Sequence, residues 1–544
     1  VVTDGDFKDY YLLAWTTTPW TLPSNRALVI DDKETYVSVF YENENYILAK
    51  KRLDSVFPEK NYEVKKEFPG KELLGLQYDP LFKYYSSKEN EFKVYTYEGM
   101  VTMEEGTGIV HSAPGFGEID TEMGRYYDLT LMMTLDDEGK MLPGTYEKNP
   151  YEGVFYLEAN QQILNELLER GVIFKNERVT HRVPYHDRCN TLLVQKAQKS
   201  WFIDIQKIKK ELIENNKEIN WVPEYVKKGI FEKTIEQAPD WCISRNRFWA
   251  TPMPVWESSD GDRLVFSSIK EIEEASGQTV KDLHRPYIDE IVIKKEGKEY
   301  RRRPEVLDSW MEAGSMPFAQ LHYPFENREK FEKNYPGDYV VEYKGQVRAW
   351  FQRMHIMSSL IFNSRCFNNV IVTGVLAGTD GRKMSKTYKN YPDSKEIINK
   401  YGGDALRLYL MGSPLMSGEN TNFDEVELKN KSRNILNPLW NSAVFFLMYA
   451  HNNNWSSKNK VISENILDKW ILIRLNQTIS DIDKFLTSYN VPPAVKSLEV
   501  FIDDLSRWYV RRSRDRISSG DNESLSTLYA VLMEFSKASA PLIP

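Results

Sequence analysis

The chain has 544 residues, and its 71 Lys and Arg against 79 Asp and Glu give a formal net charge of −8. With 41% hydrophobic and 13% aromatic residues it can bury several cores, which excludes a disordered or fibrous protein, and its length predicts roughly three to five domains. The longest apolar stretch, Ala443 to Ala450, is far shorter than the roughly 20 residues that span a bilayer, and no basic and then apolar leader opens the chain. Neither secretion nor a membrane partner is therefore expected.

The chain contains three cysteines, Cys189, Cys242 and Cys366, and none of them is paired as Cys-x-x-Cys. Their number and spacing exclude a disulfide scaffold and a four-cysteine zinc site. A reducing cytoplasm is the predicted compartment.

The first third of the chain is predicted to be rich in β-structure. Short strands are expected at residues 35–40, 46–50, 92–97, 100–103 and 108–111, the first two joined by a polar turn as a hairpin. Helical spacing follows over residues 156–169, and Gly171 is placed to end that helix.

In the middle of the chain strands and helices alternate. A short helix is expected at 270–277, a strand and then a helix within 340–362, a β-branched strand at 370–375, and a helix at 394–411. This order indicates a parallel α/β sheet. After about residue 422 the pattern becomes entirely helical, with helices expected at 467–486 and 494–517 on either side of a Pro-Pro pair.

A cationic loop follows the predicted strand at 370–375. Residues 381–387 read Gly-Arg-Lys-Met-Ser-Lys-Thr, which places Lys383 and Lys386 beside glycine and hydroxyl side chains. Such a loop can fold over a polyphosphate and neutralise the charge that develops in phosphoryl or nucleotidyl transfer. On charge alone, a solvated surface loop is the simpler interpretation.

Two segments of the first third combine hydroxyl groups with glycines. Residues 15–23 read Trp-Thr-Thr-Thr-Pro-Trp-Thr-Leu-Pro. This stretch is either an extended segment with hydroxyls that face solvent, or a cluster of hydroxyls able to hold a ribose hydroxyl, a carbonyl and a water. Residues 106–120 contain glycines that permit close approach of a substrate to the backbone. His111 and Asp120 converge if the Ala-Pro-Gly turn between them folds back, although a histidine at a strand end is commonly structural.

These motifs carry a family resemblance. Lys-Met-Ser-Lys-Thr resembles the KMSKS signature of class I aminoacyl-tRNA synthetases, and residues 390–393 and 401–407 continue that pattern. The two N-terminal segments together resemble the editing domain of isoleucyl-tRNA synthetases, whereas valyl and leucyl siblings usually have Thr-Thr-Arg-Pro. The resemblance continues through residues 239–249, 307–317 and 346–351 and covers nearly the whole chain. The sequence at 314–320 and 390–393 is most similar to the archaeal and eukaryotic-like branch.

The resemblance implies a multidomain α/β fold. A β-rich editing domain is inserted in a class I Rossmann-type catalytic fold, which an α-helical anticodon-binding domain follows. The expected extents are residues 1–183 for a β-barrel-like editing domain, 184–425 for the second part of the catalytic domain with a connective insertion and the KMSK loop, and 426–544 for the start of the anticodon-binding domain.

The implied activity is ATP-dependent activation of isoleucine and its transfer to tRNA(Ile), with hydrolytic editing of mischarged valyl-tRNA(Ile). Mg²⁺ is expected with ATP, held mainly by phosphate oxygens and water. By resemblance Lys383 and Lys386 stabilise the departing pyrophosphate, with Lys386 also at the ATP site. Glu342 holds the adenosine ribose, and Gln346 and Trp350 border the amino-acid and adenylate site.

The implied editing site consists of hydroxyl, aromatic and ionisable side chains from the two N-terminal segments. By resemblance, Thr16, Thr17 and Thr18 line the hydrolytic pocket, Trp20 helps to shape it, His111 contacts the mischarged substrate and Asp120 recognises its α-amino group. A carboxylate suits that last role because it pairs with an ammonium ion.

A helix with arginines among aromatic residues resembles the start of the anticodon-binding domain. It contains Arg507, Trp508, Tyr509, Arg511, Arg512, Arg514 and Arg516. Such a helix suits phosphate contact and base stacking, so tRNA is the expected partner, and a solvated basic face is the alternative. A monomer is expected.

The sequence departs from the family pattern in three places. None of its seven histidines occurs in the His-x-Gly-His motif that binds ATP phosphates, so the chain is interpreted as a fragment that does not itself make adenylate. Gly345 stands where the family often has Asp. Where some relatives have a zinc-binding Cys-x-x-Cys, this chain has His186 and Cys189 at that spacing, and zinc is not expected because no partner pair is visible.

Two other functions stay open from the sequence. One is a valyl or other sibling synthetase, against which the Thr-Pro-Trp order after Thr16 argues. The other is a non-catalytic tRNA-binding protein derived from a synthetase, against which the retained threonines, histidine, aspartate and lysines of the two sites argue.

Overall fold

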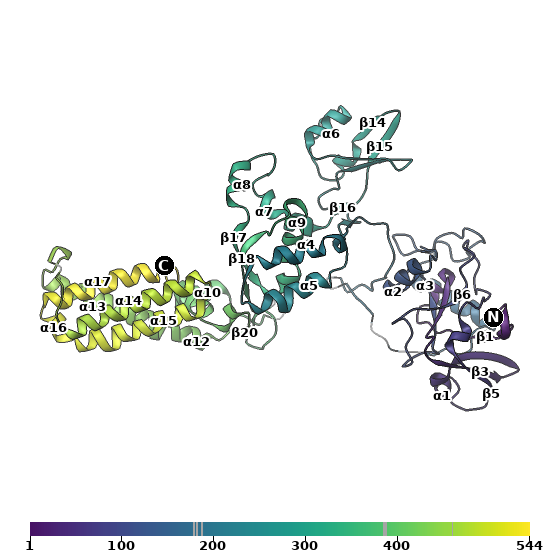
Figure 1. Ribbon diagram of the computed structural model, residues 1–544, viewed down its shortest axis with the longest axis horizontal. Helices are drawn as coiled ribbons and strands as arrows, with labels where there is room; N and C mark the ends of the chain where they lie inside the picture. The colour runs from purple at the N-terminus through teal and green to yellow at the C-terminus, as the bar shows by residue number, and fades with distance from the viewer. Residues whose placement is uncertain (178–179, 181–182, 187–188, 385–388, 460) are drawn as a thin grey trace. The chain divides into compact units, whose positions relative to one another are not determined.

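The structure is a computed structural model that describes residues 1–544 except 178–179, 181–182, 187–188, 385–388 and 460. The chain divides into two compact units, residues 1–199 and residues 200–544 (Figure 1). Within the described residues, no helix combines the length and the apolar character that crossing a membrane requires.

The first unit is built on two small sheets with short helices beside them. Its elements are β1 (Tyr11–Leu12), β2 (Ala27–Ile30), β3 (Thr35–Tyr41), β4 (Glu44–Ala49), α1 (Leu53–Val56), β5 (Glu63–Pro69), β6 (Lys93–Thr96), β7 (Ile109–Ser112), α2 (Glu118–Tyr126) and α3 (Tyr156–Glu169). One sheet has the order β1-β4-β3-β5 and the other the order β6-β2-β7. One core contains buried side chains of both sheets, such as Ile30, Tyr36 and Ile109, and the Tyr36 hydroxyl donates a 2.6 Å hydrogen bond to the carbonyl of Gly108.

Most predicted elements of this unit are confirmed. The hairpin is β3 and β4, and the helix at 156–169 has the predicted bounds, with Gly171 at φ +66° just beyond it. The strand predicted at 100–103 is wrong, because these residues form a loop. Arg52 donates hydrogen bonds to the carbonyls of Met103, Glu104 and Gly106, so a side chain rather than a neighbouring strand satisfies these three carbonyls.

The second unit begins with an α/β part. Its elements up to residue 422 are β8 (Phe202–Ile203), α4 (Ile205–Lys217), β9 (Asn220–Val222), α5 (Lys233–Glu236), β10 (Trp241–Cys242), β11 (Ser244–Arg245), β12 (Val255–Ser258), β13 (Arg263–Val265), α6 (Ile269–Ser276), β14 (Val292–Lys295), β15 (Lys298–Arg302), β16 (Val306–Leu307), α7 (Ser309–Ala319), α8 (Arg328–Asn334), β17 (Gly337–Tyr343), α9 (Trp350–Phe362), β18 (Phe367–Thr373), β19 (Leu376–Ala377), α10 (Ser394–Tyr401), α11 (Gly403–Met411) and β20 (Thr421–Asn422).

The predicted parallel sheet is confirmed. Strands β17, β18 and β9 lie in that order and all pair in parallel, and α4 and α9 contribute buried residues to the core beside them. The single helix predicted at 394–411 is wrong, since Gly402 divides it into α10 and α11. Gly402 has φ +87° and ψ +151°, a conformation that only glycine adopts readily, so the helix ends there.

The last part of the chain is helical, as predicted. Its helices are α12 (Glu425–Lys431), α13 (Asn437–Asn452), α14 (Ile466–Thr487), α15 (Val491–Asp503), α16 (Arg514–Ser518) and α17 (Asn522–Ser539). The four longest, α13, α14, α15 and α17, lie alongside one another and share one apolar core (Figure 1). The Pro-Pro pair at 492–493 does not precede α15 but forms its first turn, where a missing N–H costs no hydrogen bond.

Candidate functional site

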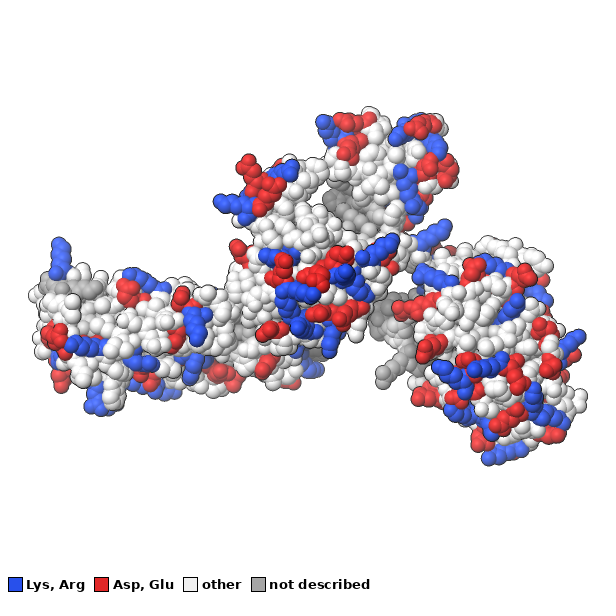
Figure 2. Space-filling view, viewed as in Figure 1, with Lys and Arg blue, Asp and Glu red and all other residues white. Residues whose placement is uncertain are grey.

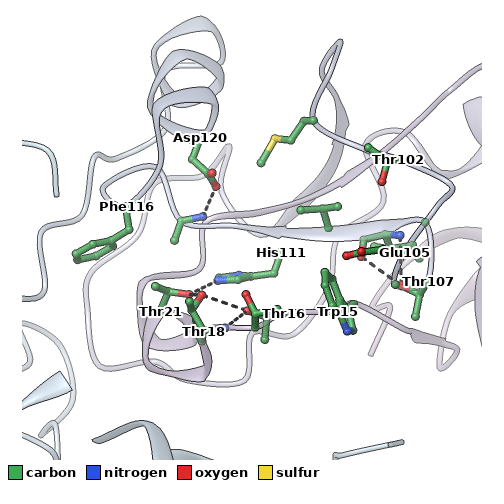
Figure 3. Close-up of a pocket in the computed structure, with 17 residues that line it drawn as sticks. Trp15, Thr16, Thr18, Thr21, Thr102, Glu105, Thr107, His111, Phe116 and Asp120 are labelled. Atoms are coloured by element: carbon green, nitrogen blue, oxygen red, sulfur yellow. Dashed lines mark hydrogen bonds between the residues drawn. The ribbon is translucent and has the colours of Figure 1, made fainter. Parts of the chain in front are cut away.

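A cavity of about 290 Å³ opens in the first unit. Its wall comes from three segments: residues 15–21, the stretch from Met100 to Ala113, and the start of α2 (Figure 3). The two motif segments of the sequence, far apart along the chain, therefore border one space. Five of the six residues assigned to the editing site line it, namely Thr16, Thr17, Thr18, His111 and Asp120.

The threonines are linked by hydrogen bonds along one wall (Figure 3). The backbone N–H of Thr18 donates to Thr16 Oγ1 at 3.0 Å, and the hydroxyl oxygens of Thr16 and Thr18 lie 3.4 Å apart. Thr21 continues the chain, with its Oγ1 3.1 Å from Thr18 Oγ1 and donating to the Thr18 carbonyl at 2.8 Å. The wall is thus an ordered row of hydroxyls rather than a solvated strand face.

His111 is held at both ring nitrogens. It lies on β7 opposite Leu28 of β2, with Nε2 3.0 Å from Thr21 Oγ1 and Nδ1 2.8 Å from Asn25 Nδ2. Burial lowers the pKa of His111 to about 4, since the charged ring would lose its hydration. At neutral pH the ring is therefore uncharged, and both nitrogens are occupied by neighbours.

Asp120 lies in the first turn of α2, and the turn between His111 and this helix brings both residues to the wall of the cavity. Its Oδ1 accepts hydrogen bonds from the Ser112 hydroxyl at 3.0 Å and from the Ala113 N–H at 2.9 Å. A Cβ at Gly117 would overlap Oδ2, so glycine there keeps space for that oxygen. Burial raises the pKa of Asp120, and hydrogen bonds from the Ala113 N–H, the Ser112 hydroxyl and its own backbone N–H oppose the rise. The group is a half-buried carboxylate that lines the cavity, and one of its oxygens is bound to Ser112 and Ala113.

Trp20 supports the pocket from behind. It is 7% exposed and is not among the residues that line the cavity. Its ring packs edge to face against Phe116, with centroids 5.0 Å apart, and Phe116 does line the cavity.

Sequence reasoning missed three polar residues of this network, Thr21, Asn25 and Tyr78. Thr21 and Asn25 lie in the same motif segment, so proximity in the sequence could have found them. Tyr78 could not be found this way, because its hydroxyl reaches Asn25 Oδ1, at 2.5 Å, from 53 residues away.

A second group of predicted residues lies in the second unit at the carboxyl end of β17. Glu342 is near the end of that strand, Gln346 follows in the next turn, and Trp350 begins α9. Gln346 Oε1 accepts from the Trp350 N–H at 3.1 Å, and the Trp350 indole N–H donates to the Ala313 carbonyl at 2.9 Å. The end of a parallel strand is where open α/β sheets bind ligands.

The cationic loop reaches this same edge through one of its lysines. Lys383 Nζ lies 5.7 Å from the centroid of the Tyr343 ring, while Lys386 lies outside the described residues. A Cβ at Gly345 would overlap that ring, so the glycine found in place of the family's Asp is what lets Tyr343 lie there.

Comparison with known proteins identifies two domains of the chain. Residues 152–422 match the tRNA synthetases class I (I, L, M and V), and residues 468–544 match the anticodon-binding domain of tRNA ligase. The chain carries a class I tRNA synthetase domain. The predicted combination of this catalytic fold with a helical anticodon-binding domain is thereby confirmed.

Several curated proteins are similar to this chain over nearly its whole length. It is 40% identical over 550 residues to an isoleucine–tRNA ligase of Protochlamydia amoebophila, 39% over 576 to one of Treponema denticola, and 40% over 545 to one of Chlamydia abortus. The alignments cover 99%, 99% and 98% of this chain and 53%, 52% and 52% of the relatives. The chain spans about half the length of the curated relatives it matches.

In the synthetase domain, His186 and Cys189 lie close to each other. Cys189 Sγ lies 3.3 Å from His186 Nδ1, and the two residues between them lie outside the described ones. Across the described part of the chain, no group of three or more His, Cys, Asp or Glu residues could hold a metal ion.

The arginine-rich helix of the anticodon-binding domain is partly internal. Tyr509 is fully buried and cannot stack on a base, and Arg516 pairs with Asp468 at 2.9 Å. Trp508 is 48% exposed with the Arg512 guanidinium 4.6 Å from its ring centroid. Figure 2 shows basic and acidic side chains interspersed over the visible face, in keeping with the small net charge.

Proposed function

We propose that this chain is part of an isoleucine–tRNA ligase, and that the cavity of its first unit hydrolyses valyl-tRNA(Ile). The whole protein would activate isoleucine with ATP and transfer it to tRNA(Ile). The observation that carries the proposal is the single cavity in which Thr16, Thr17, Thr18, His111 and Asp120 meet. The similarity to isoleucine–tRNA ligases over 99% of the chain supports the choice of amino acid.

A hydrolytic site answers a physical limit of the synthetic site. Valine is smaller than isoleucine by one methylene, and a hydrophobic pocket gains only about 1–3 kcal/mol from that difference, for which isoleucine-specific synthetases are the standing example. A second pocket that admits valine and excludes isoleucine removes the error after it is made. At about 290 Å³ the cavity is at the small end of the roughly 300–1,000 Å³ typical of ligand pockets.

The residues of the cavity suit ester hydrolysis by positioning. Asp120 Oδ2 would bind the α-ammonium of the valyl group, which places the ester beside the threonine row. A water held by the hydroxyl oxygens of Thr16 and Thr18 adds to the carbonyl carbon. The bond to the ribose oxygen then breaks and that oxygen takes up a proton, so that valine and intact tRNA are released. Orientation of the water and ester supplies the rate enhancement.

The synthetic site would use the carboxyl end of β17. Glu342 would hold the ribose, Gln346 and Trp350 would border the adenylate, and Lys383, together with Lys386, would neutralise the pyrophosphate that leaves. The arrangement of Lys383 beside the strand end supports this assignment. ATP is the proposed cosubstrate, with Mg²⁺ bound to its phosphates.

The remaining assignments stay proposals. They are an editing domain over 1–183, the second part of the catalytic domain over 184–425, the anticodon-binding domain from 426, the archaeal and eukaryotic-like branch, a monomeric state and a cytoplasmic location. Because no His-x-Gly-His occurs among the seven histidines, the chain is proposed to lack that part of the ATP site.

The test is deacylation of tRNA(Ile) carrying labelled valine or isoleucine. The chain is expected to release valine much faster than isoleucine and to give no ATP–pyrophosphate exchange. Fast release of isoleucine with valine spared contradicts the choice of substrate. Absence of any hydrolysis, with tRNA still bound, would instead favour a non-catalytic tRNA-binding protein.

A further inference from the structure

The hydrogen bonds around His111 determine which of its ring nitrogens carries the proton. Asn25 Nδ2 contacts His111 Nδ1 at 2.8 Å and also the backbone carbonyls of Ala27 at 2.9 Å and Ser112 at 3.4 Å. Carbonyl oxygens only accept hydrogen bonds, so the amide atom that faces them is the nitrogen, and it donates to the ring. Nδ1 is therefore unprotonated.

Thr21 leads to the same tautomer from the opposite side of the ring. A hydroxyl has a single hydrogen, and that of Thr21 is donated to the Thr18 carbonyl at 2.8 Å. Thr21 Oγ1 must then accept at its contact with His111 Nε2, which is 3.0 Å away. Two independent constraints thus place the ring proton on Nε2.

Tyr78 anchors the Asn25 end of this network. The phenol is 7% exposed and donates to Asn25 Oδ1 at 2.5 Å, so the carbonyl side of the amide is satisfied and its NH₂ side faces His111. Burial keeps the pKa of Tyr78 well above its usual value, which makes the hydroxyl a donor at every physiological pH.

The single hydrogen of Thr21 also sets the direction of the other threonine hydroxyls. Since Thr21 Oγ1 has no hydrogen left, Thr18 must donate to it at 3.1 Å, and Thr16 in turn donates to Thr18 at 3.4 Å. Each of these two threonines then keeps one oxygen lone pair for a ligand, because Thr16 accepts only from the Thr18 N–H. A water in the cavity would donate its hydrogens to them and turn its own lone pair outward, which is the orientation that attack on a carbonyl needs.

We propose that Tyr78 and Asn25 hold His111 as an Nε2–H donor, and that His111 acts by holding Thr21, which heads the threonine row, rather than by taking up a proton. Tyr78, Asn25 and His111 are on this account positioning residues. The proposal rests on the hydrolytic function proposed above for the same cavity. It differs from a role as general base, which would need a free lone pair on the ring.

The test combines the tautomer of His111 with the kinetics of valyl-tRNA(Ile) deacylation, both measured on the full chain. The ring ¹³C and ¹⁵N shifts of a histidine-labelled chain report the tautomer, with the His111 signals identified by their absence in His111→Gln. Tyr78→Phe leaves Asn25 Oδ1 buried without a donor, and is expected to populate the Nδ1–H form and to lower kcat about fivefold with KM unchanged. Asn25→Asp presents an oxygen to Nδ1, and is expected to invert the tautomer and to lower kcat by about tenfold or more.

Two further variants separate this role from its alternatives. His111→Gln places an amide N–H near the position of Nε2 and is expected to retain more activity than His111→Ala. Tyr85→Phe is the matched control, since Tyr85 is 5% exposed and donates to the Leu142 carbonyl at 3.1 Å, away from the cavity. It should change neither the tautomer nor kcat.

The proposal is overturned if the unmodified chain shows the Nδ1–H form, or if Tyr78→Phe and Asn25→Asp lower kcat while the tautomer is unchanged. Equal losses in His111→Gln and His111→Ala would likewise favour a general base. If the unmodified chain does not hydrolyse valyl-tRNA(Ile), the proposed function fails, while the ring shifts still decide whether Tyr78 and Asn25 set the tautomer.

Discussion

Asp120→Asn is expected to separate the activity of the pocket from the stability of the first unit. Asparagine keeps an Oδ1 that accepts from the Ser112 hydroxyl and the Ala113 N–H, so the local geometry is retained. It removes the charge that would pair with the substrate ammonium. A hydrogen bond to a charged group contributes about 1.5–3 kcal/mol, which corresponds to a loss of about 10- to 150-fold in kcat/KM.

Stability should change in the opposite direction. Burial raises the pKa of Asp120 above its unfolded value, so the folded state disfavours the ionised form. The ionised carboxylate therefore lowers the free energy of unfolding at neutral pH, and this cost disappears as the pH falls through the folded pKa. Asp120→Asn should unfold at a higher temperature than the parent at pH 7, with the difference vanishing in acid.

The assay is deacylation of valyl-tRNA(Ile) together with thermal unfolding at several pH values. Glu118→Gln is the control, because Glu118 is an exposed carboxylate two residues away in the same helical turn. It should leave both measurements unchanged. Parental activity in Asp120→Asn would refute the ammonium contact, and loss of activity accompanied by lower stability would show that the carboxylate is structural.

Three other substitutions at buried or partly buried side chains have predictable effects on stability or activity. His355 is fully buried, and desolvation lowers its pKa from 6.5 to about 4. The stability that the neutral ring contributes is therefore complete above pH 6.5 and is lost as the pH falls toward 4, with a decrease of about 2 kcal/mol in the free energy of unfolding at pH 5. His355→Gln should remove this pH dependence of thermal unfolding. Asp468→Ala removes a fully buried carboxylate that binds Arg516 at 2.9 Å. It should lower the free energy of unfolding of the helical part, measured in urea, by about 3 kcal/mol, and a decrease below about 1 kcal/mol would contradict this. Thr21→Val keeps the shape of the side chain but leaves the Nε2–H of His111 without an acceptor. It should lower the single-turnover rate of deacylation about tenfold. An unchanged rate would mean that the hydroxyl row does not act in hydrolysis.

Local pattern was enough to predict the elements whose periodicity and end signals agree. The helix at 156–169 was predicted to the residue because apolar side chains recur at helical spacing and Gly171 follows. The strand predicted at 100–103 was wrong: the chain there forms a loop, in which Arg52, about fifty residues earlier, binds the carbonyls of Met103 and Glu104. No local preference records such a contact.

The candidate site divides in the same way. The resemblance of two short motif segments to an editing domain pointed to Thr16 to Thr18, His111 and Asp120. That they share one cavity, and that Trp20 stands behind it, depends on the packing of β2, β7 and α2.

The sequence alone determined which chemical groups this protein carries: the hydroxyl row, the carboxylate and the lysine loop each belong to a short motif segment. The tertiary structure decided how that chemistry is oriented. Thr21 and His111 are 90 residues apart and meet only because β7 pairs with β2. Tyr78 and Asn25, which are 53 residues apart, also meet only in the folded chain. Hydrogen-bond direction depends on which donor meets which acceptor in space, and this is a property of the fold that no stretch of sequence contains.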